Sequence, residues 1–260
     1  MSAKLFDTHT HYVDKRYRGG ADALIQRILA DNVAGFIAVG YDVSSSRASV
    51  ALAERYDGVF AAVGVHPHDA KPSLDADYIA QLERLAVQSK VKAIGECGLD
   101  YHYDGYDRST QMNVFEAQLR LAVKLNLPVI VHSRDATADT MSILREYVPQ
   151  LKGAVMHCYA GSVETARELV AMGMLISFTG ALTFNNARVA KEVAKVIALE
   201  HIMLETDCPY MAPQAFRGKT CDSSMAWCTA EKLAEIKGIS VSEVVTACNN
   251  NAKKFFNIDF

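Results

Sequence analysis

The sequence predicts an α/β fold, a single-domain (β/α)8 TIM barrel that spans residues 1–260 and is closed by two C-terminal helices. Two observations lead to this prediction. Short runs rich in Val and Ile alternate with longer segments in which apolar residues recur at helical spacing. Eight such units follow one another within about 210 residues, which is the number and length at which parallel βαβ units close into a barrel.

The predicted elements alternate strictly along the chain. Eight strands are expected at residues 4–11, 34–42, 59–67, 91–100, 128–135, 153–161, 174–182 and 201–209. Helices are expected between them at residues 21–32, 46–56, 77–90, 109–126, 136–148, 162–173 and 187–200. Two more helices, at residues 224–238 and 240–257, are separated by the helix-stopping Gly238 and should pack on the barrel. A doubly wound open sheet is the alternative arrangement, and no Pro-, Gly- or Ser-rich linker indicates a second domain.

Composition limits the partners and the location that we expect. The formal net charge is −3 with no long run of either sign, so a nucleic acid would have to be held locally rather than by a general attraction to phosphate. The six cysteines form no C-x-x-C pair and no signal peptide precedes them, which favours reduced thiols in a cytoplasmic protein. No apolar run approaches the roughly 18 residues of a membrane-spanning helix. Nothing indicates a membrane or an obligate protein partner.

Polar residues gather at the C-terminal ends of the predicted strands, where barrel enzymes assemble their active sites. Strand by strand they are His9 and His11, His66 and His68, Glu96, His132, His157 and Asp207. A single histidine in an apolar strand is usually a hydrogen-bonded core residue. A buried carboxylate such as Glu96, which we place at the end of the fourth strand, needs a partner or a metal to offset its desolvation. Because the pattern recurs at strand after strand, one shared explanation, metal binding, is favoured.

The His9-x-His11 pair is the strongest local signal. Side chains two residues apart on a strand project from one face with Cβ atoms roughly 6–7 Å apart, so two imidazoles can converge on one cation. A divalent metal would also supply the charge that Glu96 and Asp207 lack. Nitrogen and carboxylate ligands suit zinc, manganese or another first-row ion better than calcium. Asp7 lies on the same face but deeper, and we expect it to orient a ligand.

Six motifs occur in the order FDTHTH, GVHPH, AIGECGLDY, PVIVHSRDA, MHCYAG and LETDCPY. Together they resemble the TatD family of metal-dependent hydrolases, within the amidohydrolase-like superfamily, over essentially the whole chain. The resemblance implies a site for two divalent metal ions, Mg, Mn or Zn. It implies that the ligands of the first ion are His9, His11, Glu96 and Asp207, and that those of the second are Glu96, His132 and His157. Glu96 would then bridge the two ions.

The chemistry of such a site follows from general principles. Two ions roughly 3.5–4 Å apart can hold a shared water, lower its pKa towards neutrality and clamp the attacking and leaving oxygens of a displacement at phosphorus. The expected nucleophile is that hydroxide. Asp207 is expected to accept its proton as well as to bind metal. A thiol nucleophile is not expected, because Cys97, Cys158 and Cys208 each directly follow a proposed ligand and strand alternation points them away.

His66 and Arg134 are candidate substrate contacts. His66 could donate to a phosphate oxygen, and we favour it because Pro67 restricts the backbone that positions it. His68 could equally be a solvated loop residue. Arg134 could form a bidentate pair with phosphate, and the alternative is a salt bridge to the neighbouring Asp135 or to another carboxylate on the rim.

Two further segments could contact substrate. The loop after the fourth strand holds Tyr101, Tyr103 and Tyr106. These rings could stack on nucleobases, although exposed loop tyrosines are common. Arg217 could bind phosphate. Cys221 and Ser223 stand where the family pattern more usually has Asn and Pro, which leaves the shape of that side of the pocket open.

The expected function is a metal-dependent hydrolase of ester bonds, with Asp207, Glu96 and His66 as its catalytic residues. Its specific form, which the family resemblance suggests, is a deoxyribonuclease that removes nucleotides from a DNA 3′ end, a 3′–5′ exonuclease. DNA or a nucleotide-like phosphodiester is the expected substrate. One alternative is hydrolysis of a carboxylic ester, amide or lactone by the same ligands. Another is a non-catalytic metal-binding barrel, against which the intact ligand set argues.

Overall fold

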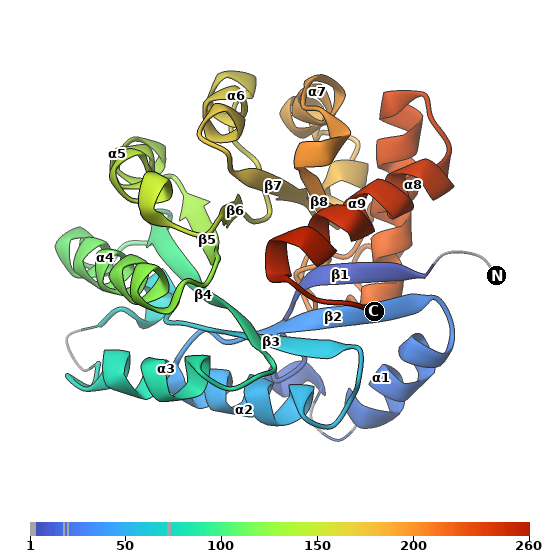
Figure 1. Cartoon of the computed structure of the whole chain (residues 1–260). Coiled ribbons are helices and arrows are strands. Elements are labelled where there is room, and N and C mark those ends of the chain that lie inside the picture. Colours follow the sequence, from blue (N-terminus) through green and yellow to red (C-terminus); the bar gives the residue numbers. More distant parts are fainter. Residues whose placement is uncertain (1–3, 18, 20, 72–73) are drawn as a thin grey trace.

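Eight parallel strands form one sheet whose spatial order follows the chain from β1 to β8. The computed structural model describes residues 4–17, 19, 21–71 and 74–260. The strands are β1 (Leu5–Thr10), β2 (Val33–Val39), β3 (Val59–Val63), β4 (Val91–Asp100), β5 (Val129–Arg134), β6 (Ala154–Met156), β7 (Leu175–Phe178) and β8 (Ile202–Leu204). The helices that follow the first seven strands are α1 (Ala21–Ala30), α2 (Val43–Ala53), α3 (Tyr78–Ala86), α4 (Arg108–Leu125), α5 (Thr137–Tyr147), α6 (Val163–Ala171) and α7 (Arg188–Val196). These helices surround the sheet (Figure 1), as the alternation predicted.

Contacts between the first and last strands bring the two edges of the sheet together. Thr10 forms a parallel bridge with Cys208. The amide of His11 donates to the carbonyl of Cys208 at 2.7 Å, and the amide of Asp207 donates to the carbonyl of His9 at 3.0 Å. The sheet is therefore a nearly closed barrel, and the open doubly wound alternative is wrong.

Helix ends are set by local side chains. α2 begins with a capping box in which the Asp42 carboxylate accepts the amide of Ser45, and Ser240 and Glu243 form the same motif at the start of α9 (Val241–Phe256). Gly238, with φ +67°, ends α8 (Ala226–Lys237) in the left-handed conformation that glycine adopts without strain. The predicted break between the last two helices is confirmed.

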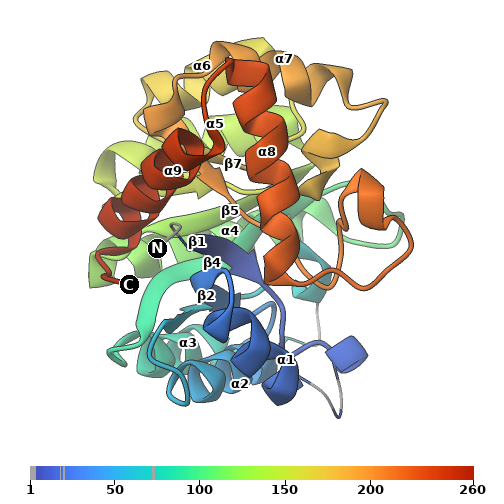
Figure 2. The same ribbon diagram turned by 90° about the vertical axis from the view of Figure 1, so that its right-hand side faces the viewer.

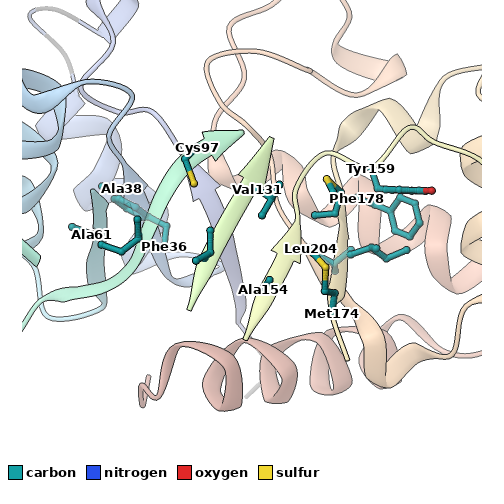
Figure 3. Close-up of a cluster of buried hydrophobic side chains, with 14 of the residues drawn as sticks. Phe36, Ala38, Ala61, Cys97, Val131, Ala154, Tyr159, Met174, Phe178 and Leu204 are labelled. Carbon is teal, nitrogen blue, oxygen red and sulfur yellow. The ribbon is translucent and has the colours of Figure 1, made fainter. Parts of the chain in front are cut away.

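Apolar side chains fill two layers because strand residues alternate between faces. Figure 3 shows part of the layer between the strands and the surrounding helices, which includes Phe36, Ala38, Cys97, Val131 and Leu204. A second cluster lies inside the barrel and takes Phe6, Ile37, Ala62, Ile130 and Met203 from five different strands. The barrel is thus packed inside, and its polar residues are left to the C-terminal ends of the strands.

The last two helices pack against each other, and the residues at the end of α9 close one end of the barrel. α8 (Ala226–Lys237) follows β8 and packs against α9 (Val241–Phe256), as Figure 2 shows. Phe256 and Ile258 pack with the inner cluster, and the Phe260 ring stacks on Phe6 with centroids 4.2 Å apart. The last residues therefore cover the N-terminal ends of the strands. They leave uncovered the C-terminal ends, where the polar residues lie. None of the helices in the described ranges is long and apolar enough to cross a membrane.

β4 ends at Asp100, as predicted, but the placement of Glu96 at the end of this strand was wrong, because Glu96 lies within it. The pairing of β4 with β5 shifts register between Ile94 and Cys97. Both of these residues pack in the outer layer, and strict alternation from Ile94 would have turned Glu96 outward as well. The irregularity re-aims Glu96 into the barrel mouth, which is a common use of strand bulges near active sites.

Candidate metal centre

The first group of polar side chains joins the two meeting edges of the barrel. His9 lies on β1 and His11 directly after it, and their Nε2 atoms are 3.1 Å apart. His9 Nε2 lies 3.3 Å from Glu96 Oε2, and His11 Nε2 lies 3.2 Å from Asp207 Oδ1 and 3.6 Å from Glu96 Oε2. Two imidazoles and two carboxylates therefore face one small space.

A second group uses the other oxygen of the same glutamate. Glu96 Oε1 lies 2.8 Å from both His132 Nδ1 and His157 Nε2, and these two nitrogens are 3.3 Å apart. The His157 ring also stacks on His9, with centroids 4.1 Å apart, so the two groups are adjacent. Glu96 thus presents one oxygen to each group.

The electrostatics keep the carboxylates ionised. Burial opposes the charge of Glu96, but the nearby imidazoles, His157 first, hold the pKa of that carboxyl well below its usual range. Burial also opposes ionisation of Asp207, yet its contact with His11 lowers the pKa below the ordinary value. Burial and the charge of His157 lower the pKa of His9, so this ring stays neutral and keeps a lone pair. The anionic carboxylates and the neutral His9 ring are in the forms that bind metals. Burial opposes the charge of His157, but Glu96 and Glu205 raise its pKa well above the ordinary value, so a cation bound there would have to displace a proton.

The donor atoms fit divalent cations. The ligand atoms of His9, His11 and Asp207 all lie within 4.8 Å of one another, and so do those of Glu96, His132 and His157. Ring nitrogens 3.1–3.3 Å apart match the roughly 3.3 Å between ligands of a tetrahedral ion with bonds of about 2.0–2.1 Å.

The hydrogen bonding of the first pair of rings agrees with this fit. His11 Nδ1 lies 3.0 Å from the carbonyl oxygen of Val39. An Nδ1–H donated there leaves the Nε2 lone pair free to face the site. The buried Nδ1 of His9 has no hydrogen-bond partner among the described residues.

A family model described as "TatD related DNase" matches residues 6–257. The chain belongs to the TatD family. It is 40% identical over 255 residues to the uncharacterized metal-dependent hydrolase YabD of Bacillus subtilis (strain 168), an alignment that covers 98% of this chain and 100% of the relative. It is 33% identical over 257 residues to the 3′-5′ ssDNA/RNA exonuclease TatD of Cronobacter sakazakii, covering 97% of each chain.

A solved structure of a TatD homolog also resembles this chain. The TatD homolog YjjV of Escherichia coli K12 superposes with a TM-score of 0.93 at 29% identity, covering 100% of both chains. The present chain is therefore a metal-dependent hydrolase of the TatD family, as the six sequence motifs predicted.

His66 lies beside the two candidate metal-binding groups of this TatD hydrolase. Its Nδ1 accepts the amide of His68 at 3.1 Å, so Nε2 carries the proton, and Nε2 lies 3.7 Å from Glu96 Oε1. Burial lowers the pKa of His66 to about 3. The ring is consequently a neutral hydrogen-bond donor at the edge of the site.

Arg134 lies farther out, on the rim of the TatD barrel. Its guanidinium lies over the ring of Tyr103, 5.2 Å from the centroid, and both side chains are exposed. Asp135 pairs with His102 at 2.7 Å rather than with Arg134.

Arg217 is exposed on the segment that follows β8. Its guanidinium lies over the Phe184 ring at 5.2 Å. Cys221 and Ser223, which depart from the family pattern, are buried. The Tyr12 hydroxyl donates to Ser223 Oγ at 2.9 Å, so this departure is accommodated by polar contacts behind the mouth of the barrel.

The cysteines next to the ligands are protonated thiols. Cys97 and Cys208 are buried in the outer layer, where alternation was expected to place them. Burial raises the pKa of Cys158 and of Cys208 to about 12. A thiolate is the reactive form of cysteine, so none of the three is suited to be a nucleophile.

Sequence reasoning missed Asp100 and Glu205. Asp100, at the end of β4, places Oδ2 3.1 Å from His132 Nε2. Glu205 accepts the amide of Cys158 at 2.6 Å and lies 3.3 Å from His157 Nδ1. Both signals were visible, because each carboxylate sits in a ligand motif at a strand end, but both motifs already held a stronger candidate.

Asp7 orients the site through the backbone. Its carboxylate accepts the amide of Thr206 at 2.9 Å, the Thr206 hydroxyl at 2.6 Å and the amide of His9 at 3.3 Å. Burial raises the pKa of Asp7 to about 7. It holds the chain segments that carry His9 and Asp207, which is the orienting role expected of it.

Proposed function

We propose that this TatD hydrolase is a deoxyribonuclease that cleaves phosphodiester bonds from the 3′ end of DNA. The observation that carries the proposal is that Glu96 presents one oxygen to each of two adjacent donor groups. Such a paired site suits displacement at phosphorus, where attacking and leaving oxygens both need stabilisation. The Cronobacter relative named as a 3′-5′ ssDNA/RNA exonuclease supports the substrate class.

In this proposal two divalent cations are bound by the residues of the two groups. His9, His11, Glu96 and Asp207 hold one ion, and Glu96, His132 and His157 hold the other. When bound, the ions supply positive charge to the phosphate and make water at the site more acidic.

Asp207 is proposed to accept the proton of the attacking water. Its side chain is 17% exposed, whereas that of Glu96 is 4% exposed, so Asp207 is the carboxylate that solvent reaches. The contact with His11 lowers the pKa of Asp207, so the carboxylate is ionised, which is the form that can accept a proton. Glu96, with an oxygen committed to each group, holds the two halves of the site together.

His66 is proposed to donate Nε2–H to a non-bridging phosphate oxygen. Because its ring is neutral, it can donate a hydrogen bond without transferring its proton. Arg134 and Arg217 on the rim are proposed contacts for phosphates next to the cleaved one. A terminus needs few such contacts, which agrees with a net charge of −3.

The test compares three substrates. Purified protein with Mg²⁺, Mn²⁺ or Zn²⁺ is given a labelled single-stranded oligonucleotide, a lactone and a dipeptide. We expect stepwise shortening of the oligonucleotide from its 3′ end. Turnover of the lactone or dipeptide alone would establish the carbonyl alternative, and metal binding without any turnover would establish a non-catalytic barrel.

Asp207→Asn and Asp135→Asn form a matched pair for this assay. Both residues have a left-handed backbone, φ +57° and +51°, which Asn tolerates. We expect D207N to abolish activity and D135N, an exposed rim position, to retain it. Activity that survives D207N would come from a contaminant or from a different mechanism.

A further inference from the structure

We propose that Asp100 is a positioning residue for His132: its carboxylate holds the ring in the Nε2–H tautomer, so that the Nδ1 lone pair faces the metal site. The inference rests on the proposed metal site, but it does not depend on the substrate.

The two nitrogens of His132 face opposite partners. Nε2 lies 3.1 Å from Asp100 Oδ2. Nδ1 lies 2.8 Å from Glu96 Oε1 and 3.3 Å from His157 Nε2. A neutral imidazole has one N–H and one lone pair, and a carboxylate can only accept. Both nitrogens therefore face carboxylates, and the one at Nδ1 is nearer. A cation bound beside Glu96 would take the Nδ1 lone pair, which leaves the ring proton on Nε2, directed at Asp100.

Asp100 is itself held firmly. Its side chain is buried, and Oδ1 accepts the amide of His102 at 2.9 Å. Its backbone amide donates to Gln111 Oε1, and its carbonyl accepts Gln111 Nε2, both at 2.9 Å. Since Gln111 is buried on α4, these bonds fix the end of β4 to the helix outside it. Both carboxylate oxygens are thus set in place, one on the backbone and one on the His132 ring.

Asp100 also connects His132 to the mouth of the barrel. His68 Nε2 lies 3.1 Å from Asp100 Oδ2, and the His68 ring stacks on Tyr106 with centroids 4.8 Å apart. The oxygen that orients His132 therefore has a second contact, in the loop region where substrate would approach.

A competing explanation is that Asp100 binds a third cation. The ligand atoms of His66, Asp100 and His132 also lie within 4.8 Å of one another. In that case the cation would take the place of the Nε2 proton of His132. The number of ions bound and the tautomer of the ring separate the two explanations.

The variant Asp100→Asn tests whether Asp100 sets the tautomer of His132. The oxygen that accepts the amide of His102 must remain an oxygen, so the new NH₂ group points at His132 Nε2. That donor requires a lone pair on Nε2 and moves the ring proton to Nδ1, which faces the metal site. D100N is therefore expected to reverse the tautomer of His132 while nearly conserving the shape of the side chain.

Two measurements test this. Long-range ¹H–¹⁵N spectra of protein labelled with ¹⁵N-histidine are recorded at alkaline pH for the wild type loaded with Zn²⁺ and for metal-free D100N, with His132 assigned from the signal missing in H132N. We expect Nε2–H in the Zn²⁺-loaded wild type and Nδ1–H in metal-free D100N. Calorimetric titration with Mn²⁺ should show that D100N loses about 10–100-fold in affinity for one of two equivalents and keeps the other.

Asp135→Asn is the matched control, because Asp135 forms the same kind of ion pair with His102 on the exposed rim. It should titrate like the wild type. The proposal is overturned if His132 of the Zn²⁺-loaded wild type is Nδ1–H, if D100N binds Mn²⁺ as tightly as D135N, or if D100N loses a third equivalent. If D100N fails to fold, the tautomer of His132 in the Zn²⁺-loaded wild type tests the proposal by itself: Nε2–H supports it and Nδ1–H overturns it. Neither readout uses an oligonucleotide, so a failure of the proposed nuclease activity alters neither result.

Discussion

Glu96 is the residue on which both halves of the proposed metal centre depend. Its side chain is 4% exposed, with Oε2 directed at His9 and His11 and Oε1 at His132 and His157. With His66, whose Nε2 lies 3.7 Å from Oε1, five imidazoles surround this buried carboxylate. It is costly to replace, because neighbouring groups are arranged around its charge.

Replacing Glu96 by Gln should weaken both metal-binding events. The amide removes the shared charge and puts an NH₂ group where an oxygen faced one of the two groups. Loss of a residue that only hydrogen-bonds to a ligand typically lowers metal affinity by about 10–100-fold. Glu96 is proposed to be a ligand itself, so we expect each affinity to fall by more than this. Mn²⁺ calorimetry measures both events. Asp207→Asn, which changes one group, should weaken only one, and wild-type affinity at either site of E96Q would contradict a shared ligand.

His66→Asn should separate substrate stabilisation from metal binding. The Asn oxygen can still accept the amide of His68, but no N–H reaches towards Glu96 Oε1. We expect kcat on an oligonucleotide to fall by roughly 10²–10³-fold, as when one donor to a developing oxyanion is lost. Both Mn²⁺ affinities should stay at the wild-type value. An unchanged kcat would remove His66 from the proposed catalytic residues.

At the scale of elements, the two ends of the barrel have separate tasks. The C-terminal ends of the strands carry the polar groups, and the N-terminal ends are covered by the end of α9. Phe256 is 1% exposed and packs in the inner cluster with Ile258. This cover stabilises the barrel without touching the metal centre.

Phe256→Ala should therefore destabilise the fold by about 3–5 kcal/mol, the usual cost of removing a buried aromatic ring. Chemical denaturation followed by circular dichroism measures the free energy of unfolding. Val87, which is 69% exposed, is the control, and V87A should stay within about 0.5 kcal/mol of the wild type. A loss below about 1 kcal/mol in F256A would mean that the end of α9 does not plug the barrel.

At the scale of the whole molecule, the charge of −3 gives no general attraction to DNA. Phosphates would be held locally, by Arg134 and Arg217 on the rim. Each phosphate contact on a single strand contributes a slope of about −0.7 to the dependence of log affinity on log salt.

Two contacts predict a shallow salt dependence. We expect kcat/KM on single-stranded DNA to fall only roughly sevenfold between 50 and 200 mM salt, from a slope of about −1.4. The double variant R134A/R217A should flatten this slope, whereas a loss of several decades in the wild type would reveal a long basic groove. The measurement is a series of initial rates at fixed metal concentration.

The sequence by itself determined the barrel, its element order and the residues that gather at its mouth. Those features follow from local periodicity and from the rule that parallel strands end on one side, so they need no knowledge of distances. Glu96 was among these residues, but the direction of its side chain could not be read from strand alternation, because a register irregularity in β4 reversed the alternation.

Only the tertiary structure decided which oxygen of Glu96 meets which imidazole, and that Asp100 stands behind His132. The motifs that carry these two carboxylates and His132 lie on different strands. Hydrogen-bond partners across strands depend on register and on side-chain direction to within about an ångström. Local pattern carries no such information, because the same residues would gather at the mouth in any register.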